Sequence, residues 1–260
     1  MKSTTRLLIL AASGSLFCQT GLLAATITLT GTVRDFHYFN TSDPPLAGHP
    51  DFQNVISDDR GIVQTQLGAD GTPVYAHGAN PTATVHGEAG FNQWFHDTPS
   101  VNLSAPLSIT LNEISPGIFS YQNTAFFPID NQLGGNQGAA HNYSFTYQIH
   151  TTFTYEPGQN FGFTGDDDVW VFINDLLAVD LGGVHGAESA SVNLDTLGLT
   201  AGNTYDFDFF FAERHTSASN MEITTSIPLV ANAPEGGSTL LYLIASGLGL
   251  FGLRRSRWGK

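Results

Sequence analysis

Aromatic and aliphatic side chains recur at every second position along two stretches of the chain, and this period constrains the fold more than any other feature. The first stretch is residues 143–155, and the second is residues 205–211, where Asp206 and Asp208 stand between aromatic residues. Successive side chains of a β-strand point to opposite faces, so a two-residue period predicts a strand with one buried face. We therefore expect two strands, the second having one face buried and the other exposed to solvent.

The other apolar runs also have the length and composition of strands. They cover residues 26–33, 107–114, 169–173, 176–179 and 221–227. Asn174 and Asp175 separate two of these runs and have the tolerance for positive φ that a two-residue hairpin turn requires. Sustained helical periodicity is missing from the sequence of the domain, although residues 91–96 suit one short amphipathic helix and residues 40–61 read as a long loop. The prediction is an all-β chain with a single β-sandwich or barrel.

The charge of the chain is strongly asymmetric. Between residues 26 and 233 the only cationic side chains are Arg34, Arg60 and Arg214, against 22 carboxylates. A nucleic-acid backbone would be repelled by this field and would find few cations to replace its counterions. We therefore expect no nucleic-acid partner, and we expect divalent cations or neutral ligands instead.

The first residues have the pattern of a secretory signal peptide. Lys2 and Arg6 precede an apolar run at residues 7–17, and small residues follow at the end of the segment 1–25. The only cysteine, Cys18, lies within this segment. We expect an exported mature chain without cysteine.

The C-terminal segment combines a polar motif, an apolar stretch and a basic tail. The motif is Pro234, Glu235, Gly236, Gly237 and Ser238. The apolar stretch, residues 240–253, spans roughly 21 Å at about 1.5 Å per residue, which is short for a hydrocarbon core of about 30 Å. Arg254, Arg255 and Arg257 follow it and favour a cytoplasmic tail. The chain thus divides into a signal peptide (1–25), a β-domain (26–230) and a C-terminal segment (231–260) with a short transmembrane stretch.

This C-terminal arrangement resembles the PEP-CTERM family of sorting signals, although Ala233 stands where valine is usual. The resemblance implies processing by an exosortase-type enzyme and delivery to the cell surface or extracellular matrix of a bacterium. A simple C-terminal membrane anchor is the alternative.

Asp166, Asp167 and Asp168 are consecutive and lie at the start of an apolar run. Neighbouring carboxylates repel one another, and a calcium ion coordinated by their oxygens would reverse that interaction. The spacing alone leaves two readings open, a calcium site and a solvated acidic turn.

Three segments closely resemble the fibro-slime domain. They are residues 163–180 (FTGDDDVWVFINDLLAVD), residues 181–186 and residues 210–215 (FFAERH). Four further segments match in the same order, at residues 49–52, 67–71, 91–95 and 126–130. The hairpin tip departs from the family, because Asp175 and Leu176 follow Asn174 where Gly and Lys are common.

The resemblance implies a relative of the fourteen-kilodalton protective-antigen domain, a β-fold of adhesins, toxins and glycosidases that often binds carbohydrate. In its lectin members, two adjacent aspartates bind calcium, which holds the hydroxyl groups of a sugar. The corresponding metal and ligand-binding residues are Asp166 and Asp167, with Asp168 beside them. Asn220 is the candidate for a further ligand, and Trp170 is expected in the core.

Glu213, Arg214 and His215 form an acid, cation and base in sequence, but a strand would point Arg214 away from the other two. We expect Arg214 and Glu213 to be structural, with Arg214 in an ion pair, because cations are scarce in the domain. His185, in a glycine-rich loop, is expected to be a hydrogen-bonded turn residue.

Known catalytic sequence patterns, including Gly-x-Ser-x-Gly and His-Glu-x-x-His, are missing from the chain. We therefore expect no catalytic residues, and the sequence predicts a calcium-assisted carbohydrate-binding module. The alternatives are a structural matrix protein in which calcium only stiffens loops and, less favoured, a glycan-cleaving enzyme.

Overall fold

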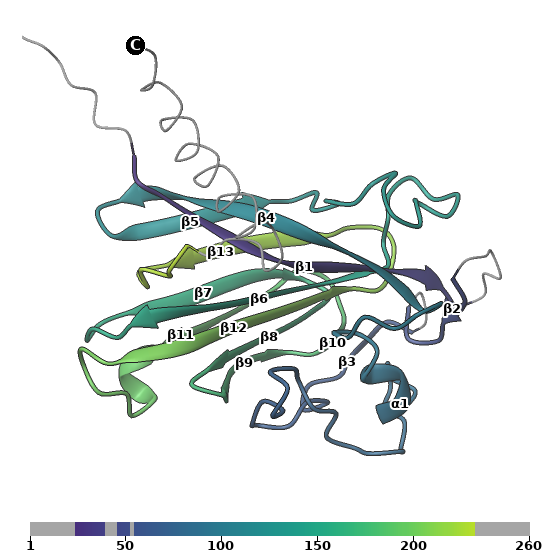
Figure 1. Cartoon of the computed structure of the whole chain (residues 1–260), viewed down its shortest axis with the longest axis horizontal. Coiled ribbons are helices and arrows are strands. Elements are labelled where there is room, and N and C mark those ends of the chain that lie inside the picture. Colours follow the sequence, from purple (N-terminus) through teal and green to yellow (C-terminus); the bar gives the residue numbers. More distant parts are fainter. Residues whose placement is uncertain (1–23, 40–45, 53–54, 232–260) are drawn as a thin grey trace, which may run out of the picture.

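A computed structural model describes residues 24–39, 46–52 and 55–231, most of which lie in strands and the loops between them (Figure 1). The strands are β1 (Thr26–Tyr38), β2 (Gly48–His49), β3 (Ser57–Asp58), β4 (Asn102–Ser115), β5 (Ile118–Asn123), β6 (Phe145–Thr154), β7 (Asn160–Asp166), β8 (Asp168–Ile173), β9 (Leu176–Leu181), β10 (Gly183–Val184), β11 (Glu188–Asn193), β12 (Thr204–Glu213) and β13 (Asn220–Thr225). The helical elements are α1 (Glu88–Phe91) and a 3-10 turn, η1 (Leu194–Thr196). The predicted all-β class is confirmed.

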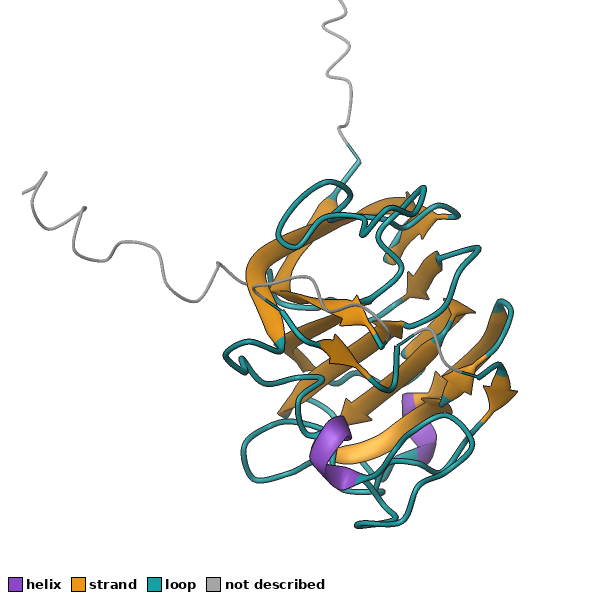
Figure 2. Cartoon of the chain, turned by 90° about the vertical axis from the view of Figure 1, so that its right-hand side faces the viewer, coloured by secondary structure: helices purple, strands orange, loops and turns teal. Residues whose placement is uncertain are grey.

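One sheet contains eleven of these strands. Its order is β11-β7-β13-β5-β4-β1-β6-β12-β8-β9, with β2 added to β1, and β10 pairs with β3 in a separate two-stranded sheet. The pairing of β1 with β2 is parallel, and the other ladders are antiparallel. The sheet curls so strongly that its end strands, β9 and β11, contact each other. It therefore forms a nearly closed barrel, whose curvature is visible in Figure 2.

The inward face of the curled sheet holds the main core. On β12, Phe207, Phe209 and Phe211 point inward and meet apolar side chains of β8, such as Val169 and Val171. This is the period-two pattern that the sequence contained. Burial of these large apolar side chains is the main source of stability of such a fold.

A second core lies on the opposite face of β8 and β12. There, Trp170 and Phe210 are covered by the segment 46–101, which contributes Phe91 and Trp94. The expectation of a solvent-exposed face on the strand at 205–211 is therefore wrong for most of that strand. Even Asp208 is buried, and it accepts a hydrogen bond from His150 Nδ1 at 2.7 Å.

Predicted elements mostly coincide with observed ones. Asn174 and Asp175 have φ of 53° and 63°, which confirms the hairpin turn. The helix expected at 91–96 lies slightly earlier, as α1. Strands β2, β3, β5, β7, β10 and β11 were not predicted. Within the described ranges, no helix combines the length and hydropathy needed to cross a bilayer.

The predicted signal peptide, sorting motif and transmembrane stretch lie outside the described residues, except for residues 24, 25 and 231 at their borders.

Candidate functional site

The three consecutive aspartates form the junction between two neighbouring strands. Asp166 ends β7, Asp168 begins β8, and a cis peptide bond joins Asp166 to Asp167. Their relative exposures are 3%, 4% and 0%, so the reading of a solvated acidic turn is wrong.

Each aspartate has different partners. Asp166 accepts hydrogen bonds from the backbone N of Asn220 at 2.5 Å and from its Nδ2 at 2.9 Å. Asp167 accepts from the backbone N of His185 at 3.2 Å and of Arg214 at 2.9 Å. Hydrogen bonds therefore connect the junction to the start of β13, to the loop after β10 and to the residue that follows β12.

Asp168 is paired with Arg214, and both side chains are fully buried. Arg214 Nε donates to Asp168 Oδ2 at 2.6 Å and Nη2 donates to Oδ1 at 3.0 Å, while Gly183 N donates to the same Oδ1 at 2.6 Å. Such a forked, charge-assisted pair occupies the carboxylate on both oxygens. The ion pair therefore occupies both carboxylate oxygens of Asp168, which the sequence had suggested as metal ligands.

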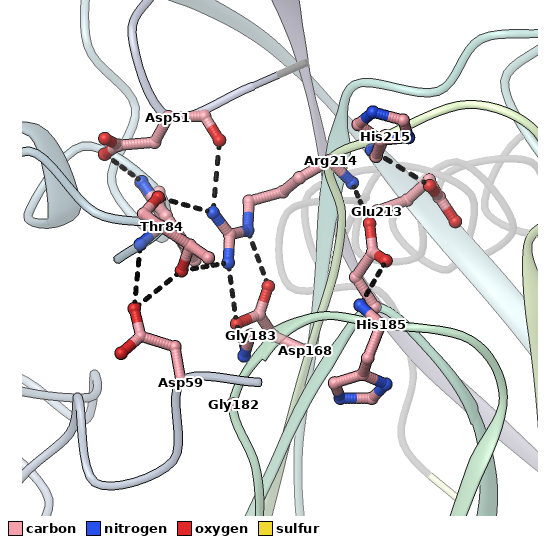
Figure 3. Close-up of polar contacts among 12 residues, drawn as sticks. Asp51, Asp59, Thr84, Asp168, Gly182, Gly183, His185, Glu213, Arg214 and His215 are labelled. Carbon is pink, nitrogen blue, oxygen red and sulfur yellow. Dashed lines mark hydrogen bonds and ion pairs between the residues drawn. The ribbon is translucent and has the colours of Figure 1, made fainter. Parts of the chain in front are cut away.

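The remaining donors of Arg214 reach into the segment 46–101. Nη1 donates to the carbonyl oxygens of Thr84 at 2.8 Å and Asp51 at 3.2 Å, and the guanidinium lies 4.5 Å from the centre of the Trp94 ring. Figure 3 shows Arg214 extending toward Asp51, Thr84 and Asp168, away from Glu213 and His215. Because Arg214 contacts both regions, it joins the aspartate junction to the second core.

Two aspartates that the sequence did not single out as site residues support this network. Asp51 Oδ2 accepts from Trp94 Nε1 at 3.1 Å, and Asp59 Oδ2 accepts from Thr84 Oγ1 at 2.8 Å. Asp51 lies in residues 49–52, one of the segments whose sequence resembles the fibro-slime domain. That resemblance was the sequence signal available for this residue. Nothing in the local sequence connects it to Arg214.

The other predicted structural residues lie close to this junction. His185 directly follows β10, with Nδ1 at 2.9 Å from the carbonyl oxygen of Gly186. Trp170 is buried in the second core and donates from Nε1 to Asp180 Oδ1 at 3.0 Å. Glu213 is buried at the end of β12 and accepts a hydrogen bond from His215 N at 3.3 Å.

A pocket of about 140 Å³ opens beside the first two aspartates. Its lining consists of Ile56, Asp166, Asp167, Val184, His185, Gly186, His215, Thr216, Ser217 and Ala218. Asp168 and Asn220 are not among the lining residues. A larger hollow of about 290 Å³ lies elsewhere, over β7, β11 and β13, but its only ionisable side chain is Glu222. The smaller pocket is the candidate site because it holds the paired carboxylates.

The carboxylates at the pocket are electrostatically crowded. Burial and the neighbouring charge of Asp168 raise the pKa of Asp167 to about 7, against the opposing effect of Arg214. Burial and the charge of Asp167 also raise the pKa of Glu213, although its contact with Ser219 opposes the rise. Asp168 compensates the charge of Arg214. The other carboxyl groups at the pocket have no such partner among the described residues, and a bound cation would relieve the repulsion between them.

Asp166, Asp167 and Asn220 supply oxygen atoms, which are the donors that calcium prefers. The donor type and the charge therefore fit calcium. Within the part of the chain that the structure describes, however, no group of three or more His, Cys, Asp or Glu side chains is placed to hold a metal ion. Water or ligand oxygens would have to complete a coordination shell of six to eight.

Comparison with known proteins identifies relatives of the chain. Residues 128–238 match the PA14 domain. Protein psiQ of Dictyostelium discoideum is 48% identical over 185 residues, which cover 65% of this chain and 19% of psiQ. Protein psiD of the same organism is 45% identical over 186 residues, which cover 66% of this chain and 37% of psiD. The chain thus spans well under half the length of these two relatives.

Among solved structures, a PA14 sugar-binding domain from an RTX adhesin aligns with 77% of this chain and 94% of its own length, with 8% identity and a TM-score of 0.34. This structural similarity is distant, whereas the sequence matches are close. The chain is therefore similar to a part of each psi protein, and its residues 128–238 are similar to the PA14 domain.

Proposed function

We propose that the chain is an exported binding module of the cell surface or extracellular matrix, whose pocket binds carbohydrate through a calcium ion held by Asp166 and Asp167. The observation that carries this proposal is the pair of adjacent, buried carboxylates lining a pocket. Asn220 does not line the pocket but donates from Nδ2 to Asp166, and we propose its side-chain oxygen as a further ligand.

The chemistry of the pocket supports calcium as the partner of these carboxylates. Burying an unpaired carboxylate is unfavourable, and a divalent cation compensates two such charges at once. A calcium ion also accepts further oxygen ligands, so the hydroxyl groups of a sugar could complete its shell. The module binds its ligand without catalysing a reaction.

The wider assignment follows the sequence resemblances. The chain would be a fibro-slime member of the PA14 family, exported by the segment 1–25. Its C-terminal motif at residues 234–238 would be processed by an exosortase-type enzyme. Export would place the acidic domain where calcium is plentiful.

The test of the metal is thermal unfolding of the purified chain with millimolar calcium and with a chelator. A ligand that binds only the folded state stabilises it, by about 2.7 kcal/mol when present at about one hundred times its Kd. We expect calcium to raise the Tm of the wild type and not of Asp167→Asn. Asp175→Asn is the matched control, because it removes one carboxylate from the exposed hairpin turn after β8. An unchanged wild-type Tm would remove calcium from the proposal.

The test of the ligand is a glycan array probed with the same three proteins. Calcium-dependent binding by the wild type and Asp175→Asn, with loss in Asp167→Asn, is the expected result. Silence of all three proteins would contradict carbohydrate binding.

A structural matrix protein is the second candidate, and one observation favours it. Asp166 and Asp167 already accept hydrogen bonds from Asn220, His185 and Arg214, which hold the surrounding loops together. In this case calcium would raise the Tm although no glycan bound.

A further inference from the structure

One large apolar side chain at the pocket is exposed to solvent. Ile56 has 66% of its surface exposed, and it lines the pocket together with Asp166 and Asp167. Exposing an isoleucine forgoes the free energy of burying its apolar surface. A position at the edge of a binding pocket explains this exposure, because a ligand can cover the side chain.

The backbone fixes the position of Ile56. The next residue, Ser57, begins β3 and pairs with Val184 of β10. This ladder requires Gly183, whose φ is +123° and where a Cβ atom would lie 2.5 Å from the carbonyl oxygen of Ser57. Gly183 N in turn donates to Asp168. The aspartate junction therefore holds the strand that places Ile56 at the pocket.

The charges at the pocket restrict what it can bind. Its lining contains two carboxylates and two histidines but no lysine or arginine. Arg214, whose backbone N donates to Asp167, has a fully buried side chain directed toward Asp168, Thr84 and Asp51. An anionic ligand would meet no lysine or arginine among the residues that line the pocket. Glu213, whose charge interacts with Asp167, adds to the acidic character of this region.

From these observations we infer that the acidic lining of the pocket favours a neutral pyranose over an acidic sugar, and that Ile56 is the residue on which the sugar ring packs. The hydroxyl groups of the ring face Asp166 and Asp167, and its C–H face packs on Ile56. A pyranose presents both kinds of surface, polar at its edge and apolar on its face. This inference rests on the proposed carbohydrate function and deepens it by naming the ligand class and the residue that contacts the apolar face of the ligand.

The experiment compares Ile56→Ser with Ile114→Ser in the full chain. Ile114 is the matched control, because it is 64% exposed and lies on β4, outside the pocket lining. Both variants and the wild type are applied, with millimolar calcium, to an array of neutral hexose and N-acetylhexosamine glycans beside glycans that carry uronic or sialic acid. The strongest neutral glycan is then titrated by calorimetry.

We expect the wild type to bind neutral glycans only. Ile56→Ser should weaken that binding about tenfold, through loss of apolar contact, and Ile114→Ser should leave it unchanged. The Tm of both variants should match the wild type, since neither side chain is buried.

Equal binding by Ile56→Ser and the wild type would overturn the role of Ile56 while leaving carbohydrate binding intact. Preference of the wild type for acidic glycans would overturn the ligand class. Absence of any glycan binding by the wild type would overturn the proposed function itself, and the inference with it.

Discussion

At the scale of single residues, the few cations of the domain have unequal roles. Arg34 contacts Asp97, and Arg60 contacts Asp58 and Glu188, each pair having at least one exposed member. Arg214 is the fully buried one, and Asp168, Asp167 and Asp51 raise its pKa although burial opposes the rise. The charge of Arg214 is therefore permanent, and its loss would leave Asp168 buried and unpaired.

Arg214→Met should destabilise the chain by about 3–5 kcal/mol, the usual effect of breaking a buried pair by removing one partner. Arg60→Met, the control, should change stability by less than about 1 kcal/mol because its pairs are exposed. Urea unfolding monitored by circular dichroism measures both. Equal losses of stability in the two variants would contradict the role of Arg214 in a buried ion pair. Adding Asp168→Leu to Arg214→Met should recover part of the lost stability.

A second residue-scale prediction concerns Asp35 at the end of β1. Burial raises its pKa to about 7, although hydrogen bonds from Asn142 and Gly134 oppose the rise. The folded state thus favours the neutral form, and this contribution to stability is complete below pH about 4 and lost as the pH rises through about 7.

Asp35→Asn keeps the group neutral at every pH. Relative to this variant, the wild type should lose stability between pH 4 and 7, at no more than about 1.4 kcal/mol per pH unit, and the difference should level off above pH 7. Urea unfolding across that range tests the sign. Parallel profiles for the two proteins would show that Asp35 titrates normally.

At the scale of elements, the two-residue strands β3 and β10 matter more than their length suggests. They bring the segment 46–101 against the aspartate junction, and they do so through a backbone approach that only glycine permits at position 183.

Gly183→Ala should therefore lower stability by about 1–3 kcal/mol, from backbone strain and the contact with Ser57. It should also weaken ligand binding, because Ile56 would move. Gly186→Ala is the control for stability alone, because a Cβ atom there meets nothing within 4 Å but Gly186 itself lines the pocket. Thermal unfolding of both variants gives the comparison, and a harmless Gly183→Ala would mean that β3 adjusts freely.

At the scale of the whole molecule, the residues that match the PA14 domain are only a part of those that form the folded unit. The matched residues 128–238 exclude β1, β4 and β5, yet these three strands lie side by side within the large sheet, between β13 and β6. The segment 46–101, which covers the second core, is excluded as well.

A fragment of residues 128–238 should accordingly fail to fold, whereas residues 24–231 should unfold in a cooperative transition. Removing neighbouring strands from the sheet interior exposes core side chains and leaves unpaired strand edges. Circular dichroism on heating distinguishes the two fragments. A cooperative transition in the shorter one would show that the matched region is a self-sufficient domain.

The sequence by itself determined the all-β class, most of the strands and the hairpin at Asn174, because alternation and turn chemistry are local properties. It missed β11, whose small and polar residues offer little contrast between faces, and β7, although Phe161 and Phe163 alternate there with Gly162 and Thr164. The aspartate run was visible as a candidate site, but the roles of its three members were not.

Only the tertiary structure decided that Asp168 pairs with Arg214, that Asp166 and Asp167 line a pocket, and that Ile56 stands beside them. It also decided that the outer face of β12 is mostly buried, since its cover comes from a segment more than a hundred residues earlier. Contacts between residues far apart in the chain depend on how the sheet curls and which loops meet at its end, and the local pattern of the sequence contains no record of either.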